Sequence, residues 1–145
     1  MNVPTNEEIR MLKEYVLLPY VLTAFDRDAK QITAAVKTPG PYADTIQRAM
    51  DAITSDIVQL RSYFRASGIR VLDMKRTADG IQAKYVYRSH HSEFMMLTNL
   101  IRVEAELLMR RYLGEDVTRY IRKDLPGGLA DFGDGSRTTL RANTS

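Results

Sequence analysis

The sequence predicts an α+β protein that is mostly helical: an antiparallel helical bundle with one β-hairpin between the third and last long helices. Apolar residues recur at helical spacing before residue 66 and again over 96–112, and two alternating segments flank an Asp-Gly pair at 79–80. Glycine or proline stands where these segments end. The 145 residues are expected to form a single helical core domain over 1–113, with hairpin 69–88, and a C-terminal extension over 114–145.

The first helix is predicted to begin near Asn6, because Thr5 and Glu8 have the spacing of a capping box. Pro19 lacks the N–H donor that a helix interior needs, so we expect a kink or a break between residues 9–17 and a second helix over 20–36. The second segment carries one apolar stripe, formed by Leu18, Leu22, Phe25, Ala29, Ile32 and Val36.

The next helix has the clearest pattern in the chain. Pro41 suits its first turn and Gly68 suits a left-handed C-cap, which places the helix over residues 41–66. Its predicted buried stripe consists of Tyr42, Ile46, Ala49, Met50, Ile53, Ile57, Leu60 and Phe64.

Residues 69–74 and 81–88 are predicted to form the hairpin, with Asp79-Gly80 as its turn. Alternation assigns one face to Leu72, Met74, Ala83, Tyr85 and Tyr87, and the other face to Val71, Lys75, Lys84, Val86 and Arg88. We expect one of these faces to pack and the other to meet solvent. An isolated hairpin is marginal in water, so this one must pack on helices, join a further strand or pair with another copy.

Two registers are open for this hairpin. A two-residue turn would place Lys75 opposite Lys84, a like-charge pair. A four-residue turn would place Asp73 opposite Lys84 and Val71 opposite Val86, and we prefer this register because its charges are complementary.

The last long helix is predicted over residues 89–113, with Ser89 or Ser92 as its cap and Gly114 as its terminator. Its wide apolar arc contains Met96, Leu97, Leu100, Ile101, Val103, Leu107, Leu108 and Tyr112. Glu104 and Arg111 project into this arc, so we expect them to take part in buried ion pairing; a catalytic acid with its charge partner is the alternative. A short helix over 115–123 and a flexible tail are expected to follow.

Residues 61–88 carry the strongest charge signal. We call their cations the basic edge: Arg61, Arg65, Arg70, Lys75, Arg76, Lys84 and Arg88. Only Asp73 and Asp79 oppose these seven charges, which leaves five net positive charges, against +3 for the whole chain. Such an edge is expected to contact anions or a partner. It could neutralise phosphates, and Tyr85 or Tyr87 could stack on bases if their rings were exposed. The predicted hairpin faces place both tyrosines with Leu72 and Met74, so the rings are expected to be buried and not free for bases. A protein partner is therefore the preferred interpretation.

The sequence predicts no catalytic, cofactor or metal site. It contains no cysteine, which excludes disulfides and thiolate chemistry and favours a reducing, cytoplasmic compartment. His90, His91 and Glu93 lack the helical spacing of zinc ligands, and residues 131–136 lack the context of a magnesium or calcium loop. No signal peptide is expected, and the longest apolar stretch, residues 15–25, is too short to cross a bilayer.

Three local patterns resemble a known family. They are Leu18-Pro19 followed by Val21-Leu22 and Arg27-Asp28, then Pro41-Tyr42, and then the run from Asp56 to Phe64 that ends before Ile69. Over roughly residues 9–113 the chain is similar to the YhjD-like proteins, a small family of Gram-positive spore-formers and their phages. The resemblance implies no activity, cofactor or catalytic residue.

These observations predict a non-enzymatic regulatory or adaptor protein that acts through protein–protein contacts. The apolar arc over 96–112 is wider than a small bundle covers, so a homodimer is expected. The alternative is a nucleic-acid-binding protein that uses the basic edge over 61–88.

Overall fold

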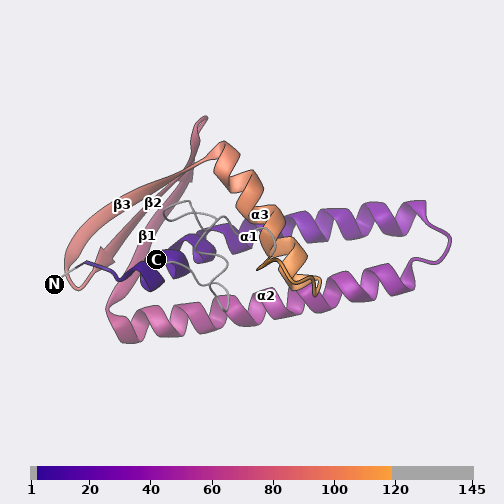
Figure 1. Ribbon diagram of the computed structural model, residues 1–145, viewed down its shortest axis with the longest axis horizontal. Helices are drawn as coiled ribbons and strands as arrows, with labels where there is room; N and C mark the ends of the chain where they lie inside the picture. Colours follow the sequence, from indigo (N-terminus) through magenta and orange to yellow (C-terminus); the bar gives the residue numbers. More distant parts are fainter. Residues whose placement is uncertain (1–2, 119–145) are drawn as a thin grey trace.

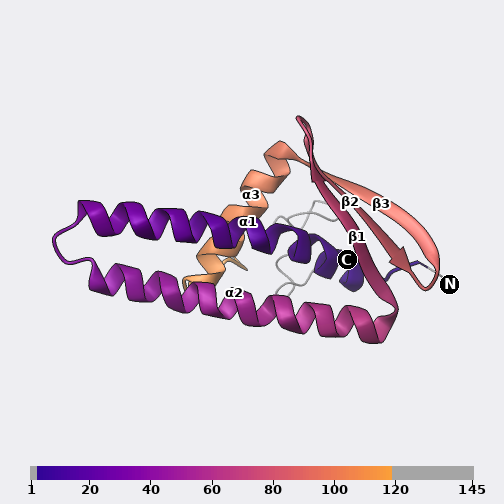
Figure 2. The same ribbon diagram turned by 180° about the vertical axis from the view of Figure 1, so that it is seen from behind.

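The computed structural model describes residues 3–118, and these form three helices and one three-stranded sheet. The elements follow in the order α1 (Asn6–Ala35), α2 (Gly40–Ser67), β1 (Ile69–Arg76), β2 (Gly80–Tyr87), β3 (His90–Leu97) and α3 (Thr98–Tyr112). The α+β, mostly helical class is therefore confirmed. Helices α1 and α2 form a long antiparallel hairpin, and the sheet lies at the end where α1 begins and α2 ends (Figures 1 and 2).

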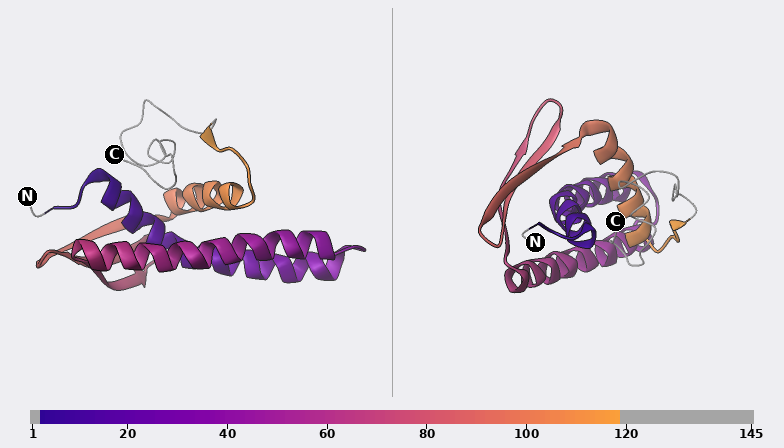
Figure 3. Two further views of the ribbon diagram at one scale, coloured as in Figure 1. Left: turned by 90° about the horizontal axis from the view of Figure 1, so that it is seen from below. Right: turned by 60° about the vertical axis from the view of Figure 1, so that its left-hand side comes forward.

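Of the two alternatives predicted at Pro19, a kink or a break, the break is wrong, because helix α1 runs through this residue. The capping box is confirmed: Glu8 N–H donates to Thr5 Oγ1 over 3.1 Å, and Thr5 N–H donates to Glu8 Oε1 over 3.0 Å. Figure 3 shows the first part of α1 inclined to the remainder, as a proline kink would give. The helix continues because Pro19 lies on its exposed side, while its neighbours Leu17 and Leu18 are fully buried.

Helix α2 starts and ends where its glycine and proline residues predict. Pro41 lies in the first turn, and Gly68 is the left-handed C-cap, with a φ of 76°. The buried stripe is confirmed for Ile46, Ala49, Ile53, Leu60 and Phe64. Tyr42, at the far end of the helical hairpin, is exposed instead of buried.

The sheet has three antiparallel strands in the order β1-β2-β3, where the sequence predicts a single hairpin. The predicted pairing of Asp73 with Lys84 is confirmed. Val71, however, faces Tyr85 and not Val86, because a β-bulge lies between Val71 and Asp73 and inserts one extra residue into β1.

The bulge and the edge position of β1 also change which side chains are buried. Tyr85 and Tyr87 are each 4% exposed, which confirms that they face the core. Leu72 and Met74 do not share that burial: they are 45% and 39% exposed, respectively. Leu72 lies within the bulge, and Met74, although paired with Ala83, lies on the edge strand.

Strand β3 occupies residues that the sequence assigns to the last helix. A two-residue turn joins β2 to β3, with φ values of 49° at Arg88 and 76° at Ser89, the left-handed pair that a tight hairpin turn of this kind requires. Neither Ser89 nor Ser92 therefore caps a helix, and α3 begins only at Thr98.

The core lies between α1, α2, α3 and the inner face of the sheet. Its most deeply buried members are Leu12, Val16, Leu17, Leu18, Val21 and Phe25 of α1, Ala49 and Ile53 of α2, Ile81 and Ala83 of β2, Met96 of β3 and Leu108 of α3. Helix α3 lies across one side of the helical hairpin (Figure 3). Phe64 of α2 and Ile69 of β1 belong to the same core, which holds the junction between α2 and β1, where the candidate site lies.

Gly114 follows the end of α3 with a φ of 99°, so its predicted role as terminator is confirmed. Residues 115–117 are not helical, in contrast to the short helix predicted over 115–123. The rest of that predicted helix, the predicted flexible tail and residues 131–136 lie outside the described residues.

Candidate functional site

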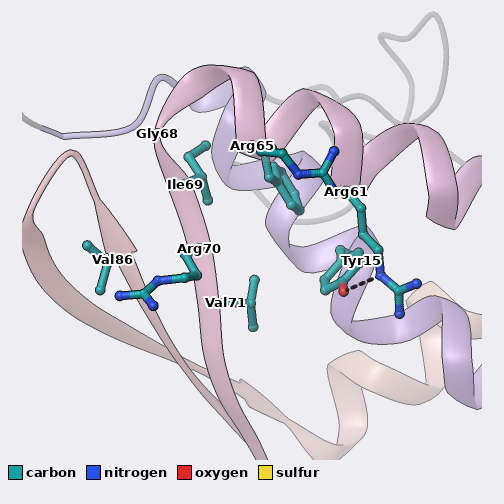
Figure 4. A pocket seen from close by; sticks show the side chains of 9 residues that line it. Tyr15, Arg61, Arg65, Gly68, Ile69, Arg70, Val71 and Val86 are labelled. Carbon is teal, nitrogen blue, oxygen red and sulfur yellow. Dashed lines mark hydrogen bonds between the residues drawn. The ribbon is translucent and has the colours of Figure 1, made fainter.

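A groove of about 470 Å³ lies where α2 passes into β1 (Figure 4). Its lining comes from α1, the last turns of α2, the start of β1 and one residue of β2. The lining residues are Tyr15, Arg61, Phe64, Arg65, Gly68, Ile69, Arg70, Val71 and Val86. Three of the seven cations of the basic edge therefore line one concave surface, which we call the arginine groove.

Arg61 is oriented by Tyr15. Arg61 Nε donates to Tyr15 Oη over 3.1 Å, and the guanidinium carbon lies 6.0 Å from the centre of the tyrosine ring. The Tyr15 ring packs edge-on against Phe64, with 5.4 Å between ring centroids. Because the hydrogen bond uses Nε alone, both Nη groups of Arg61 remain available for a forked contact with a carboxylate or phosphate.

Arg65 and Arg70 lie on either side of the α2–β1 junction. Arg65 belongs to the last turn of α2, where a cation complements the helix dipole, and Arg70 is the second residue of β1. Both side chains are exposed. In Figure 4, Arg70 points to the side of β1 that faces away from Arg61 and Arg65. This arrangement favours an extended anionic ligand over a single small anion.

The remaining lining of the groove is apolar. Phe64 and Ile69 are each 4% exposed, Val86 is 8% exposed, and Val71 is half-buried beside them. The groove therefore offers cations at its rim and packed aliphatic and aromatic carbon beneath them. A ligand that carries both acidic and apolar groups matches this lining.

Two further cations of the basic edge stack on tyrosines. The guanidinium carbon of Arg76 lies 5.5 Å from the ring centre of Tyr20, and that of Arg88 lies 5.1 Å from the ring centre of Tyr87. Both distances are within the range of cation–π contacts. Tyr87 is thus covered by its own neighbour and by the core, which leaves no free ring face for a base.

The two lysines of the basic edge lie on the outer face of the sheet. Lys84, on the central strand, has Asp73 opposite it on β1 and Glu93 opposite it on β3. Lys75 is opposite Gln82. The basic edge is therefore divided among the arginine groove, two tyrosine stacks and a face where acids surround Lys84.

The two charged residues predicted within the apolar arc of the last helix have different surroundings. Arg111 forms an ion pair with Glu14 of α1, and not with Glu104. Glu104 is 3% exposed, and its Oε2 has no hydrogen-bond partner among the described residues. Burial raises the pKa of Glu104 from 4.5 to about 7, although the nearby charge of Lys13 acts in the opposite direction.

A second polar contact holds α3 to the helical hairpin. The Tyr112 hydroxyl donates to Asp56 Oδ2 over 2.5 Å, which joins the end of α3 to the middle of α2. Burial raises the pKa of Tyr112, and the negative charges of Glu14 and Asp56 raise it further. Tyr112 therefore stays protonated and acts as a hydrogen-bond donor.

Within residues 3–118, no group of three His, Cys, Asp or Glu side chains is arranged to hold a metal ion. His90 and His91 are consecutive residues of β3 and therefore point to opposite faces of the sheet. The helices of the same region include none that is both long enough and apolar enough to cross a membrane.

Sequence reasoning found the three arginines of the groove but missed Tyr15, Phe64 as a lining residue, and Val86. Tyr15 lies 46 positions before Arg61 in the chain, and only the antiparallel pairing of α1 with α2 brings the two together. The apolar patterns of the two helices do not predict a contact between Tyr15 and Arg61.

The fold and the groove define a small α+β protein built on a helical hairpin, with a basic, partly apolar groove beside its sheet. The sequence model of the YhjD protein family matches residues 3–117, and the chain belongs to that family. The match includes the region of the predicted resemblance. Comparison with curated proteins and comparison with solved structures both gave no match.

Proposed function

We propose that this YhjD-family protein is a non-enzymatic adaptor that binds an acidic segment of a partner protein in its arginine groove. The observation that carries this proposal is that Arg61, Arg65 and Arg70 all line one groove whose remaining lining is apolar. An arginine guanidinium can donate two parallel hydrogen bonds to one carboxylate. The apolar lining can also pack against apolar side chains of the same ligand. The absence of cysteine favours the cytoplasm as the place of binding.

A protein segment suits this groove better than a nucleic acid does. Tyr85 and Tyr87 are buried, so neither offers a stacking surface for bases. Lys84 faces acids on both neighbouring strands, which weakens its attraction for phosphate. The groove also has apolar lining, for which a sugar–phosphate backbone has no matching group. Nucleic-acid binding therefore stands as the competing outcome of the experiment below.

The first prediction concerns a triple variant, Arg61→Gln with Arg65→Gln and Arg70→Gln. We expect it to bind a fluorescent peptide of about ten residues, in which glutamate alternates with valine, at least about tenfold more weakly than the parent. A tenfold loss corresponds to about 1.4 kcal/mol of binding free energy, a modest demand for three charge-assisted contacts. Fluorescence anisotropy at about 50 and 150 mM salt measures the loss.

The matched control replaces three exposed cations far from the groove, Lys37, Arg48 and Arg102, by glutamine. Each triple variant removes three positive charges and so takes the formal net charge from +3 to 0. If the control weakens peptide binding as much as the groove variant does, the attraction is a property of total charge and the proposal is wrong. If a single-stranded oligonucleotide displaces the peptide, and Lys84→Ala with Arg88→Ala abolishes its binding, the protein is a nucleic-acid binder instead.

A further inference from the structure

Strand β1 has an open edge beside the arginine groove. The strand order β1-β2-β3 gives β1 a strand neighbour on one side only within the described residues. In an antiparallel pair, alternate residues direct their backbone N–H and C=O groups toward the partner strand and away from it. Which residues of β1 face away from β2 can therefore be worked out from any bond that fixes the alternation.

Two backbone hydrogen bonds fix this alternation along β1, one before the bulge and one after it. Arg88 N–H donates to Gly68 O over 2.9 Å, and Thr77 N–H donates to Gly80 O over 2.7 Å. Counting inward from these pairs along the observed register identifies the residues whose backbone groups point to the open edge. They are Ile69, Val71, Met74 and Arg76.

The open edge of β1 runs along the arginine groove. Ile69 and Val71, which direct backbone groups to the edge, also line the groove between Arg61, Arg65 and Arg70. Farther along the strand, the exposure of Leu72 (45%) and Met74 (39%) shows that no described helix covers this edge. Figure 4 shows the β1 ribbon running beside the groove from Ile69 past Val71.

We propose that the partner segment binds by strand addition, as a fourth strand on the open edge of β1; this rests on the function proposed above. Backbone hydrogen bonds would provide register, and alternating side chains would provide specificity. On the outer face, Arg70 and Lys75 flank the added strand, so its outward side chains are acidic. On the inner face it meets Val71 and Met74, so its inward side chains are apolar.

A second copy of β1 is a poorer occupant of this edge. Antiparallel pairing of two β1 strands centred between Leu72 and Asp73 would place Arg70 opposite Lys75 of the other copy. Like charges directly opposite each other destabilise a strand pair. Positive charge on an edge strand thus discourages self-pairing while it attracts an acidic strand.

The experiment compares three forms of the glutamate–valine peptide on the parent protein. One is unmethylated, and the other two carry N-methyl groups on alternate amides in opposite phases. Strand addition uses only one phase of peptide N–H groups. We therefore expect one methylated form to bind at least about tenfold more weakly than the unmethylated peptide, and the other to stay within about threefold.

A pair of protein variants tests the same contact from the other side. Met74→Pro removes an N–H that points to the open edge, without removing a bond to β2, and edge strands tolerate proline at such positions. We expect Met74→Pro to bind the unmethylated peptide at least about tenfold more weakly than Met74→Ala, because both variants lose the same side-chain contact and only Met74→Ala keeps the N–H. Matching circular dichroism spectra and urea midpoints show that both variants are folded.

The results of these experiments distinguish a failure of strand addition from a failure of the adaptor function. If both methylated forms bind like the unmethylated peptide, while the triple arginine variant still loses it, strand addition is wrong and the adaptor function stands. If the parent binds no form of the peptide, both proposals fail. If light scattering finds a dimer that Met74→Pro dissociates, a second copy occupies the edge and strand addition by a partner is overturned.

Discussion

Gly80→Ala is expected to destabilise the protein by about 3 kcal/mol or more, and to detach β3 from the sheet. A Cβ atom at position 80 would lie 1.9 Å from the carbonyl oxygen of Met96 and 2.8 Å from its carbonyl carbon. Both are backbone atoms of the neighbouring strand, so no side-chain rotation relieves the clash. The pairing of Gly80 with Leu97 must open, and this exposes Met96, which is 1% exposed in the fold.

Gly40→Ala is the matched control, since it adds the same methyl group at the start of α2. A Cβ atom there meets nothing within 4 Å, and alanine favours the helix by up to about 1 kcal/mol over glycine. Urea unfolding followed by circular dichroism compares the two variants with the parent. A free energy of unfolding for Gly80→Ala within about 0.5 kcal/mol of the parent value would contradict the close approach of β2 to β3.

The helical part of the fold was predictable because its signals are local. Thr5 with Glu8 starts α1, and Gly68 ends α2, through contacts that span three or four residues. Pro19 was the exception. Its local rule predicts a kink or a break, and the choice depends on tertiary packing: the fully buried Leu17 and Leu18 hold the helix together across the proline.

The third strand was not predictable from these rules. Its turn consists of Arg88 and Ser89, which lack the Asn-Gly or Asp-Gly signature of left-handed turn pairs. Residues 94–97 are consecutive apolar residues, a run that fits the start of a helix as well as a strand. The bulge at Leu72 shifts the alternation of β1 by one residue, so Val71 before it and Met74 after it share the inner face; strict alternation could not predict this shift.

For the candidate site, the sequence predicted the charge but not its distribution. Composition identified all seven cations of the basic edge, yet only the fold separates the three in the groove from the two that stack on tyrosines. The pairing of Lys84 with Asp73 was visible in the register argument, whereas Glu93 became its neighbour only through β3. Long-range pairing therefore decides which charges are free to bind.

Glu104→Gln is expected to stabilise the protein at pH 8 by on the order of 3 kcal/mol, and to have little effect at pH 4.5. In the folded state the pKa of Glu104 is raised by burial from 4.5 to about 7, so the folded protein holds a proton that the unfolded chain releases. Between pH 4.5 and about pH 7 the folded state binds more protons than the unfolded state, so the free energy of unfolding falls as the pH rises. Glutamine carries no proton to release, so this part of the pH dependence disappears.

The measurement is the free energy of unfolding in urea at pH 4.5, 6, 7 and 8 for the parent and the variant. Glu106→Gln is the control on the same helix: Glu106 is exposed and forms an i,i+4 pair with Arg110, which is worth a few tenths of a kcal/mol. A gain from Glu104→Gln that is equal at pH 4.5 and pH 8 would show that the amide improves packing or hydrogen bonding, and that the carboxyl does not titrate in the fold. A gain that grows between pH 4.5 and 7, and changes little between pH 7 and 8, is the result that the buried Glu104 carboxyl between α3 and α1 requires.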